Sequence, residues 1–242
     1  LMTGGMKILV ASWLIGMVLI GASYGSIFAD LDTFIEGNEF LAESVAAAGV
    51  DIVTQFISVL VLTTSIIGIV PALMISGRIL REEKHGRLEW LESACIRRRT
   101  ILLSHGIYAV VIGFIGIAAA MLGMYGASMN VEGIDMTFGD YMLIAVNYGG
   151  AVVLFVGLSM LLIGISARLH IIVWFYLLYS FFVNYLGLIL NLDDVWRMAT
   201  PFHHLAGVPL ESMDWAAWGG VVAIGIVLMV LGVLLFRRRD VG

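Results

Sequence analysis

The sequence has 242 residues, of which 61% are hydrophobic and 13% are charged, with a mean hydropathy of +1.02 and a formal net charge of −5. Because soluble domains are usually about 45–50% apolar, this composition excludes an ordinary soluble protein and indicates a membrane protein. The single cysteine, Cys95, also excludes an internal disulfide framework.

Six apolar stretches are long enough to cross a membrane as helices. A crossing helix needs about 20 mainly apolar residues, and none of the six contains Asp, Glu, Lys or Arg. We therefore predict an all-α polytopic protein with one transmembrane domain, 1–242. The first stretch could alternatively be a signal peptide preceded by Lys7, but its apolar run is longer than a usual signal core. The predicted spans are 8–29, 52–76, 101–125, 142–165, 171–190 and 215–236.

The segments that join the predicted spans differ in charge. Segments 30–51, 128–141 and 191–214 are rich in Asp and Glu, and Arg197 is the one basic residue in them. Every other one of the 13 Lys and Arg residues lies at the opposite ends of the spans. By the positive-inside rule the basic segments are cytoplasmic. Both termini and the segment between the second and third spans are therefore expected in the cytoplasm.

Two glycine patterns predict close packing between spans. Gly21 and Gly25 form a GxxxG pattern in the first span, and Gly225 and Gly232 lie seven residues apart in the last. Small residues at such spacings let helix backbones approach one another.

The outer segment 191–214 is not expected to be one continuous helix. Its two prolines, Pro201 and Pro209, interrupt helical hydrogen bonding. We expect short or re-entrant segments packed near the outer mouth.

Mildly polar side chains occur inside the predicted spans, although no acidic or basic side chain does. Thr54, Ser58 and Ser65 fall on one face of the second span, and Asn147 and Asn184 lie in the fourth and fifth. They are interpreted either as hydrogen bonds between helices or as the lining of a substrate path. Carriers driven by an ion gradient usually place an ionisable group at depth, so the sequence disfavours that mechanism.

No motif for catalysis or metal binding is present. The chain has no GxxxxGK[ST] phosphate loop, no HExxH and no paired cysteines. The adjacent His203 and His204 would make a poor chelate, because neighbouring side chains of a helix point about 100° apart. Segment 157–160, Gly-Leu-Ser-Met, is only faintly similar to the Gly-x-Ser-Gly of intramembrane serine proteases, and the sixth span has no histidine to act as base.

The segment 78–100 concentrates charge between the second and third spans. If it is helical over about 80–95, then Leu88, Leu91 and Cys95 form an apolar stripe among acidic and basic side chains. A positive-inside anchor accounts for the arginines but not for the glutamates or the stripe. Mixed charge around a small apolar ridge favours docking into a groove of a soluble partner.

This segment contains a pattern made of Glu82-Glu83, Gly86, Glu89, Leu91, Ser93 and Arg97–Arg99. The pattern resembles the cytoplasmic loop of type-2 ABC transporter permeases. The family usually has a proline before the closing basic position, where this chain has Ala94-Cys95-Ile96. The segments 200–215 and 232–242 are also similar to the outer loop and the closing helix of that family, specifically of the C-terminal half of polyketide-antibiotic or tetronasin-type exporter permeases.

The resemblance implies a permease subunit without its own ATPase site or cofactor, driven by ABC ATP-binding subunits that bind ATP and Mg. It implies export of hydrophobic or amphipathic compounds such as antibiotics from a bacterial plasma membrane, with lipid, polysaccharide or haem-type cargo as the alternative. A membrane scaffold or sensor is the alternative of a different class. An exporter needs a second six-span bundle, from another chain or from the other half of a longer permease; membrane lipids are further partners, and nucleic acid is not. The expected docking residues of the coupling helix are Glu82, Glu83, Gly86, Leu88, Glu89 and Leu91.

Overall fold

The computed structural model describes residues 4–36, 52–84, 98–129, 131, 136–186 and 193–236. All regular structure in these ranges is helical, and six helices are long and apolar enough to cross a membrane. The predicted all-α fold with six spans is therefore confirmed. The six are α1 (Gly4–Glu36), α3 (Ile52–Ser76), α6 (Arg98–Ser128), α7 (Phe138–Ile165), α8 (Ile171–Leu186) and α10 (Trp215–Phe236). The short elements are α4 (Arg78–Lys84), η1 (Ala167–His170), α9 (Asp194–Met198) and η2 (Pro201–His204).

Three of the six long helices, α1, α6 and α7, extend beyond the stretches that hydropathy marked. α3 and α10 have the same bounds as the predicted spans, whereas α1 continues to Glu36 and α6 begins at Arg98. Helical hydrogen bonding continues through charged residues, while hydropathy marks only the apolar part. α8 is described as far as Leu186, and the last four residues of its predicted span lie outside the described part.

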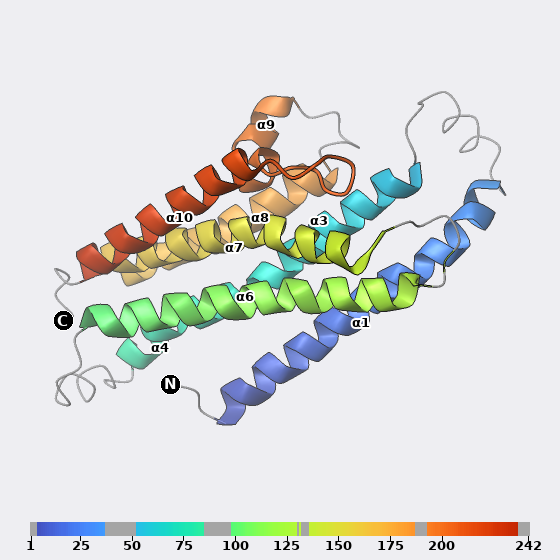
Figure 1. Ribbon diagram of the computed structural model, residues 1–242. Helices are drawn as coiled ribbons and strands as arrows, with labels where there is room; N and C mark the ends of the chain where they lie inside the picture. The colour runs from blue at the N-terminus through green and yellow to red at the C-terminus, as the bar shows by residue number, and fades with distance from the viewer. Residues whose placement is uncertain are drawn as a thin grey trace.

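α6 and α7 form the centre of the bundle (Figure 1). α1 packs along α6, α10 packs along α7, α3 contacts both central helices, and α8 contacts α3 and α7. In its most apolar stretch α7 has 72% of its residues buried, against 17% for α1 and 22% for α10. The two outer helices therefore present most of their apolar side chains to the surroundings of the bundle.

Pairs of glycines bring α7 and α10 into backbone contact. A Cβ on Gly157 would collide with the Gly225 carbonyl, and one on Gly164 would collide with the Gly232 carbonyl. In the other direction, a Cβ on Gly225 would lie 2.8 Å from the Leu154 backbone nitrogen. The seven-residue spacing matches on both helices, so the prediction from Gly225 and Gly232 is confirmed.

The predicted GxxxG pattern joins α1 to α6. A Cβ on Gly21 would collide with the Ala120 carbonyl, and one on Gly25 would lie 2.5 Å from the Met124 carbonyl oxygen. Gly123 of α6 faces α1 in the same way, against the Val18 carbonyl. Close packing at this pattern is confirmed.

The two ends of the bundle carry different short elements. α4 lies at the end of the bundle where α1 begins and α10 ends (Figure 1), and we call this the basic end. α9 and η2 lie at the opposite end, which we call the acidic end. As expected from the prolines, segment 191–214 forms short elements within its described part. Pro201 begins η2, and Phe202 and Leu205 are buried against the bundle.

Candidate functional site

A cavity of about 440 Å³ lies at the acidic end. Its walls come from α3, α7, α8, α9 and η2 with the loop that follows it, so segments distant in the chain enclose it. A volume of this order is sufficient for a drug-sized molecule. The lining residues are Ser58, Val59, Leu62, Tyr148, Asn184, Arg197, Phe202, His203, Leu205, Gly207, Leu210 and Glu211.

A row of aromatic ring contacts begins at the wall of this cavity. The Tyr148 ring of α7 lies 6.2 Å from the Phe202 ring of η2, centroid to centroid, and both residues line the cavity. Phe202 continues to Phe155, at 6.1 Å, and Phe155 to Tyr176, at 5.3 Å. The rings thus connect η2 to α7 and α8 through one packed layer.

Hydrogen bonds from α8 hold the α9–η2 segment in place. The Tyr176 hydroxyl donates to the Ala199 carbonyl at 2.8 Å, and the Tyr179 hydroxyl donates to the Trp196 carbonyl at 2.7 Å. The Asn184 amide donates to the Thr200 hydroxyl at 3.1 Å and to a carbonyl of its own helix. The two tyrosine bonds satisfy backbone carbonyls at the end of α9, which has no further helical turn to pair with them.

The residues proposed from the sequence as path lining separate into distinct groups. Ser58 and Asn184 both line the cavity. Asn147 is buried and is not part of the lining, but its amide donates to the Ala206 carbonyl at 2.9 Å, between the lining residues Leu205 and Gly207. Ser65 is buried in α3 away from the cavity lining, and the side chain of Thr54 lies outside the described part. Asn147 and Asn184 therefore bond to the outer segment and not to another span, while Ser58 and Asn184 line the cavity. Both the interpretation as bonds between helices and the interpretation as a substrate path stay predictions.

Several cavity residues did not emerge from the sequence as site candidates. Tyr148 looks like any aromatic residue of a span, and Phe202 and Glu211 look like parts of an outer loop. Arg197 carried a signal, because it is the one basic residue in the acidic segments. The structure places Arg197 half-buried in the cavity wall, whereas Glu211 is exposed and accepts the Gly207 N–H at 3.0 Å.

At the basic end, a buried hydrogen-bonded chain links three elements. The Ser76 hydroxyl at the end of α3 lies 2.8 Å from the Ser159 hydroxyl of α7, and Ser159 lies 3.2 Å from His170 Nδ1 in η1. Ser76 and Ser159 are fully buried. A Cβ on Gly77, the residue between α3 and α4, would collide with the His170 ring. We call Ser76, Gly77, Ser159 and His170 the polar joint.

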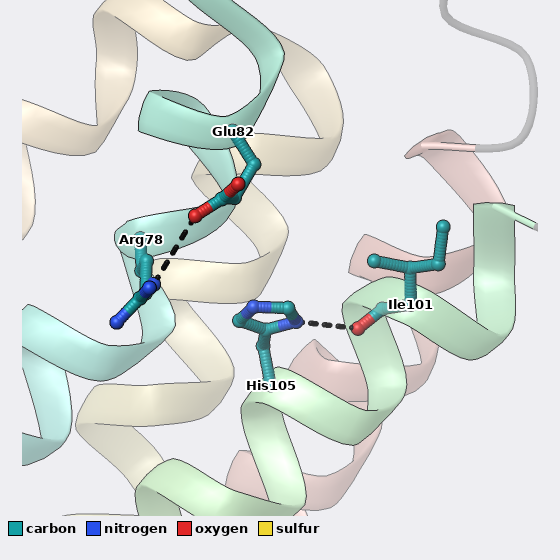
Figure 2. A network of polar contacts seen from close by, with 4 residues as sticks. All are labelled: Arg78, Glu82, Ile101 and His105. Atoms are coloured by element: carbon teal, nitrogen blue, oxygen red, sulfur yellow. Dashed lines mark hydrogen bonds and ion pairs between the residues drawn. The ribbon is translucent and has the colours of Figure 1, made fainter. Parts of the chain in front are cut away.

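The first turns of α4 lie beside the polar joint. Arg78 and Glu82 form an ion pair at 3.3 Å, and His105 on the neighbouring α6 donates through Nδ1 to the Ile101 carbonyl at 2.8 Å (Figure 2). Of the expected docking residues, Glu82 and Glu83 belong to α4. The other four, Gly86, Leu88, Glu89 and Leu91, lie outside the described part, as does most of the expected helix over 80–95.

The contact between Ser159 and His170 has the residue types of a nucleophile and its base. Ser159 is fully buried and is also bonded to Ser76, so no substrate carbonyl could reach its oxygen. The geometry therefore fits a structural link between helices rather than an active site. In the described ranges, no three His, Cys, Asp or Glu side chains come together as metal ligands would.

Comparison with known proteins identifies the family of this chain. No curated protein gives a significant match to the chain. The family model described as "Multidrug efflux system permease Rv1217c, C-terminal domain" matches residues 6–237. Because this match covers nearly all of the 242 residues, the chain belongs to the family of the C-terminal domain of the multidrug efflux system permease Rv1217c.

Proposed function

We propose that this chain is one permease half of an ATP-driven exporter of the type-2 ABC class, which moves amphipathic compounds such as antibiotics out across a bacterial plasma membrane. Family membership supports the efflux part of the proposal. The absence of charged residues from the span interiors supports an external energy source, because gradient-driven carriers usually place an ionisable group there.

The observation that carries the ATP-driven part is the polar joint at the basic end. α4 follows α3 after the single residue Gly77, and the joint bonds this corner to Ser159 and to His170. A displacement of α4 by a docked ATP-binding subunit would therefore reach α7 and η1 directly. Well-packed, hydrogen-bonded contacts transmit such displacements because they deform little.

The cargo would bind in the acidic-end cavity. Its walls include both α7, which belongs to the polar joint through Ser159, and the α9–η2 segment. Movement of α7 relative to α8 would change the shape of the cavity at the far end of the bundle. A second six-span bundle and a pair of ATP-binding subunits would complete the exporter.

Co-purification and reconstitution test this proposal. The tagged chain, expressed in its own host, should co-purify with an ATP-binding subunit and a second six-span bundle. In proteoliposomes the complex should hydrolyse ATP faster in the presence of transported compounds, and Gly86→Trp should abolish this stimulation if residues 80–95 dock the partner. A scaffold or sensor would show no substrate-stimulated hydrolysis, and recovery of the chain without any ATP-binding subunit would refute the proposal.

A further inference from the structure

We propose that a water molecule is bound inside the bundle between α3 and α8, where it bridges the hydroxyls of Ser65 and Ser180. This internal water site lies one helical turn beyond the lining of the acidic-end cavity, toward the basic end. The inference goes beyond the proposed function, because it concerns the interior of this chain and requires neither ATP nor cargo. It rests on two unpaired hydroxyls, on their common level and face, and on the space around them.

The first observation is that both hydroxyls are buried and unpaired. Ser65 and Ser180 are 0% exposed, and their Oγ atoms have no hydrogen-bond partner anywhere in the part of the chain that the structure describes. Such hydroxyls in helices often bond to a carbonyl of the preceding turn, as those of Thr63 and Thr64 do at 2.8 and 2.7 Å. A buried hydroxyl without a partner is unfavourable, and an internal water is the usual partner for such a group.

The second observation is that the two serines lie at the same level of the bundle. α3 and α8 run in opposite directions, because the polar joint contains both the end of α3 and the element that precedes α8. Leu62 of α3 and Asn184 of α8 line the acidic-end cavity together. Ser65 follows Leu62 by three residues and Ser180 precedes Asn184 by four, so each lies about 4.5–6 Å closer to the basic end.

The two serines also share the inner faces of their helices. Ser65 precedes Ser76 by eleven residues, which is close to three helical turns, and Ser76 bonds to Ser159 of α7. Ser180 is one turn from Asn184, whose amide donates to the Ser180 carbonyl at 2.8 Å. Both hydroxyls therefore belong to the interior that α3, α7 and α8 enclose.

The third observation is the space between α3 and α8. Besides the acidic-end cavity, an apolar cavity of about 420 Å³ lies between these helices, with Ile66 and Phe181 among its lining residues. These are the chain neighbours of Ser65 and Ser180, so α3 and α8 leave space on two sides of this level. A bound water needs room for about one molecule and roughly two to four polar partners. Each hydroxyl can donate one hydrogen bond and accept others.

The internal water site would continue the polar lining of the cavity toward the polar joint. Ser58 in the cavity wall, Ser65 and Ser76 lie close to one face of α3, at its acidic end, middle and basic end. Under the proposed function, a polar group of the cargo would find hydrogen bonds at mid-depth instead of a wholly apolar interior.

The first test is a double-mutant cycle on the purified full chain, measured as the midpoint of SDS-induced unfolding. Ser65→Ala and Ser180→Ala should each lower the midpoint, and the double variant should lower it by clearly less than the sum. The two hydroxyls do not bond to each other, so this coupling would report the shared water.

The control for the cycle pairs Ser65→Ala with Ser104→Ala, which should be additive because Ser104 bonds to a carbonyl of its own helix, α6. Additive effects of Ser65→Ala and Ser180→Ala, whatever their sign, would overturn the proposal. A higher midpoint in both single variants would also overturn it, because removal of a dry, unpaired hydroxyl stabilises a protein.

The second test needs no variant. Synchrotron X-rays produce hydroxyl radicals from bound water, and mass spectrometry then locates the side chains that these radicals oxidise. With the full chain in nanodiscs of phosphatidylcholine, Ile69, one turn from Ser65, should be oxidised several-fold faster than Ile117 of α6, although both are 0% exposed. The difference should disappear in the double variant. Equal rates at Ile69 and Ile117 in the unmodified chain would refute the internal water site, and neither result depends on transport.

Discussion

At the scale of single residues, Ser159 is the link on which the basic end depends. Its hydroxyl is shared with Ser76 and His170, two residues from other elements, at 2.8 and 3.2 Å. Hydrogen bonds between membrane helices contribute on average less than about 1 kcal/mol each, although some reach nearly 2. Two of them on one buried atom therefore make Ser159 more sensitive to substitution than an ordinary serine of a span.

Ser159→Ala should lower the free energy of unfolding by about 1–2 kcal/mol, because it removes both bonds and leaves His170 without this contact. SDS-induced unfolding of the purified protein in mixed micelles measures the change. The matched control is Ser104→Ala, since Ser104 bonds to the Ile101 carbonyl of its own helix. A loss no greater than that of the control would show that the polar joint does not stabilise the bundle.

At the scale of helices, the contact between α7 and α10 depends on the absence of side chains. Gly225→Leu would place a side chain where even a Cβ lies 2.8 Å from the Leu154 nitrogen. Because backbone atoms cannot move aside as a flexible side chain can, we expect a loss of about 3 kcal/mol in unfolding free energy and partial release of α10.

The same substitution at Gly219 provides the control for Gly225→Leu. A Cβ on Gly219 would have no other atom within 4 Å, although both glycines belong to α10. SDS-induced unfolding should place Gly219→Leu close to the unmodified protein. Equal losses for the two variants would mean that helix propensity, and not the contact with α7, explains the effect.

The start of α7 depends on a reciprocal cap. The Thr137 backbone N–H donates to Asp140 Oδ2 at 2.7 Å, and the Asp140 N–H donates to Thr137 Oγ1 at 3.4 Å. Thr137→Ala should cost about 1 kcal/mol in unfolding free energy, because it removes the hydroxyl that donates to Asp140 Oδ2 and accepts from the Asp140 N–H. Thr137→Ser keeps the hydroxyl and should unfold like the unmodified protein, so an equal loss in Thr137→Ser would count against the cap.

At the scale of the whole molecule, the separation of charge predicts the orientation. We expect the basic end in the cytoplasm and the acidic end outside. In a Cys95→Ser background, Ser212→Cys should react with a membrane-impermeant maleimide in intact cells. Thr100→Cys should react only in inverted vesicles. Both positions are exposed, so the difference would report topology and not burial. The opposite labelling pattern would reverse the predicted orientation.

The sequence by itself determined the all-helical fold, the number of membrane-length helices and the glycine patterns that pack closely. These are local properties, because about 20 consecutive apolar residues suffice to define a span and a few positions suffice to define a small-residue pattern. It did not reveal which helices those patterns join. Gly225 and Gly232 pair with Gly157 and Gly164 only because α10 lies along α7.

Only the tertiary structure shows which distant residues share a hydrogen bond and which line one cavity. Ser76 and Ser159 are 83 residues apart and share a hydrogen bond. Arg197 and Tyr148 come from different elements and line one cavity. Neither pairing has a signature in the chain: the serines and Tyr148 are ordinary in their local settings, and Arg197 stands out only as the one basic residue of the acidic segments. A site of this kind arises from the packing of distant helices, and only their three-dimensional arrangement brings its residues together.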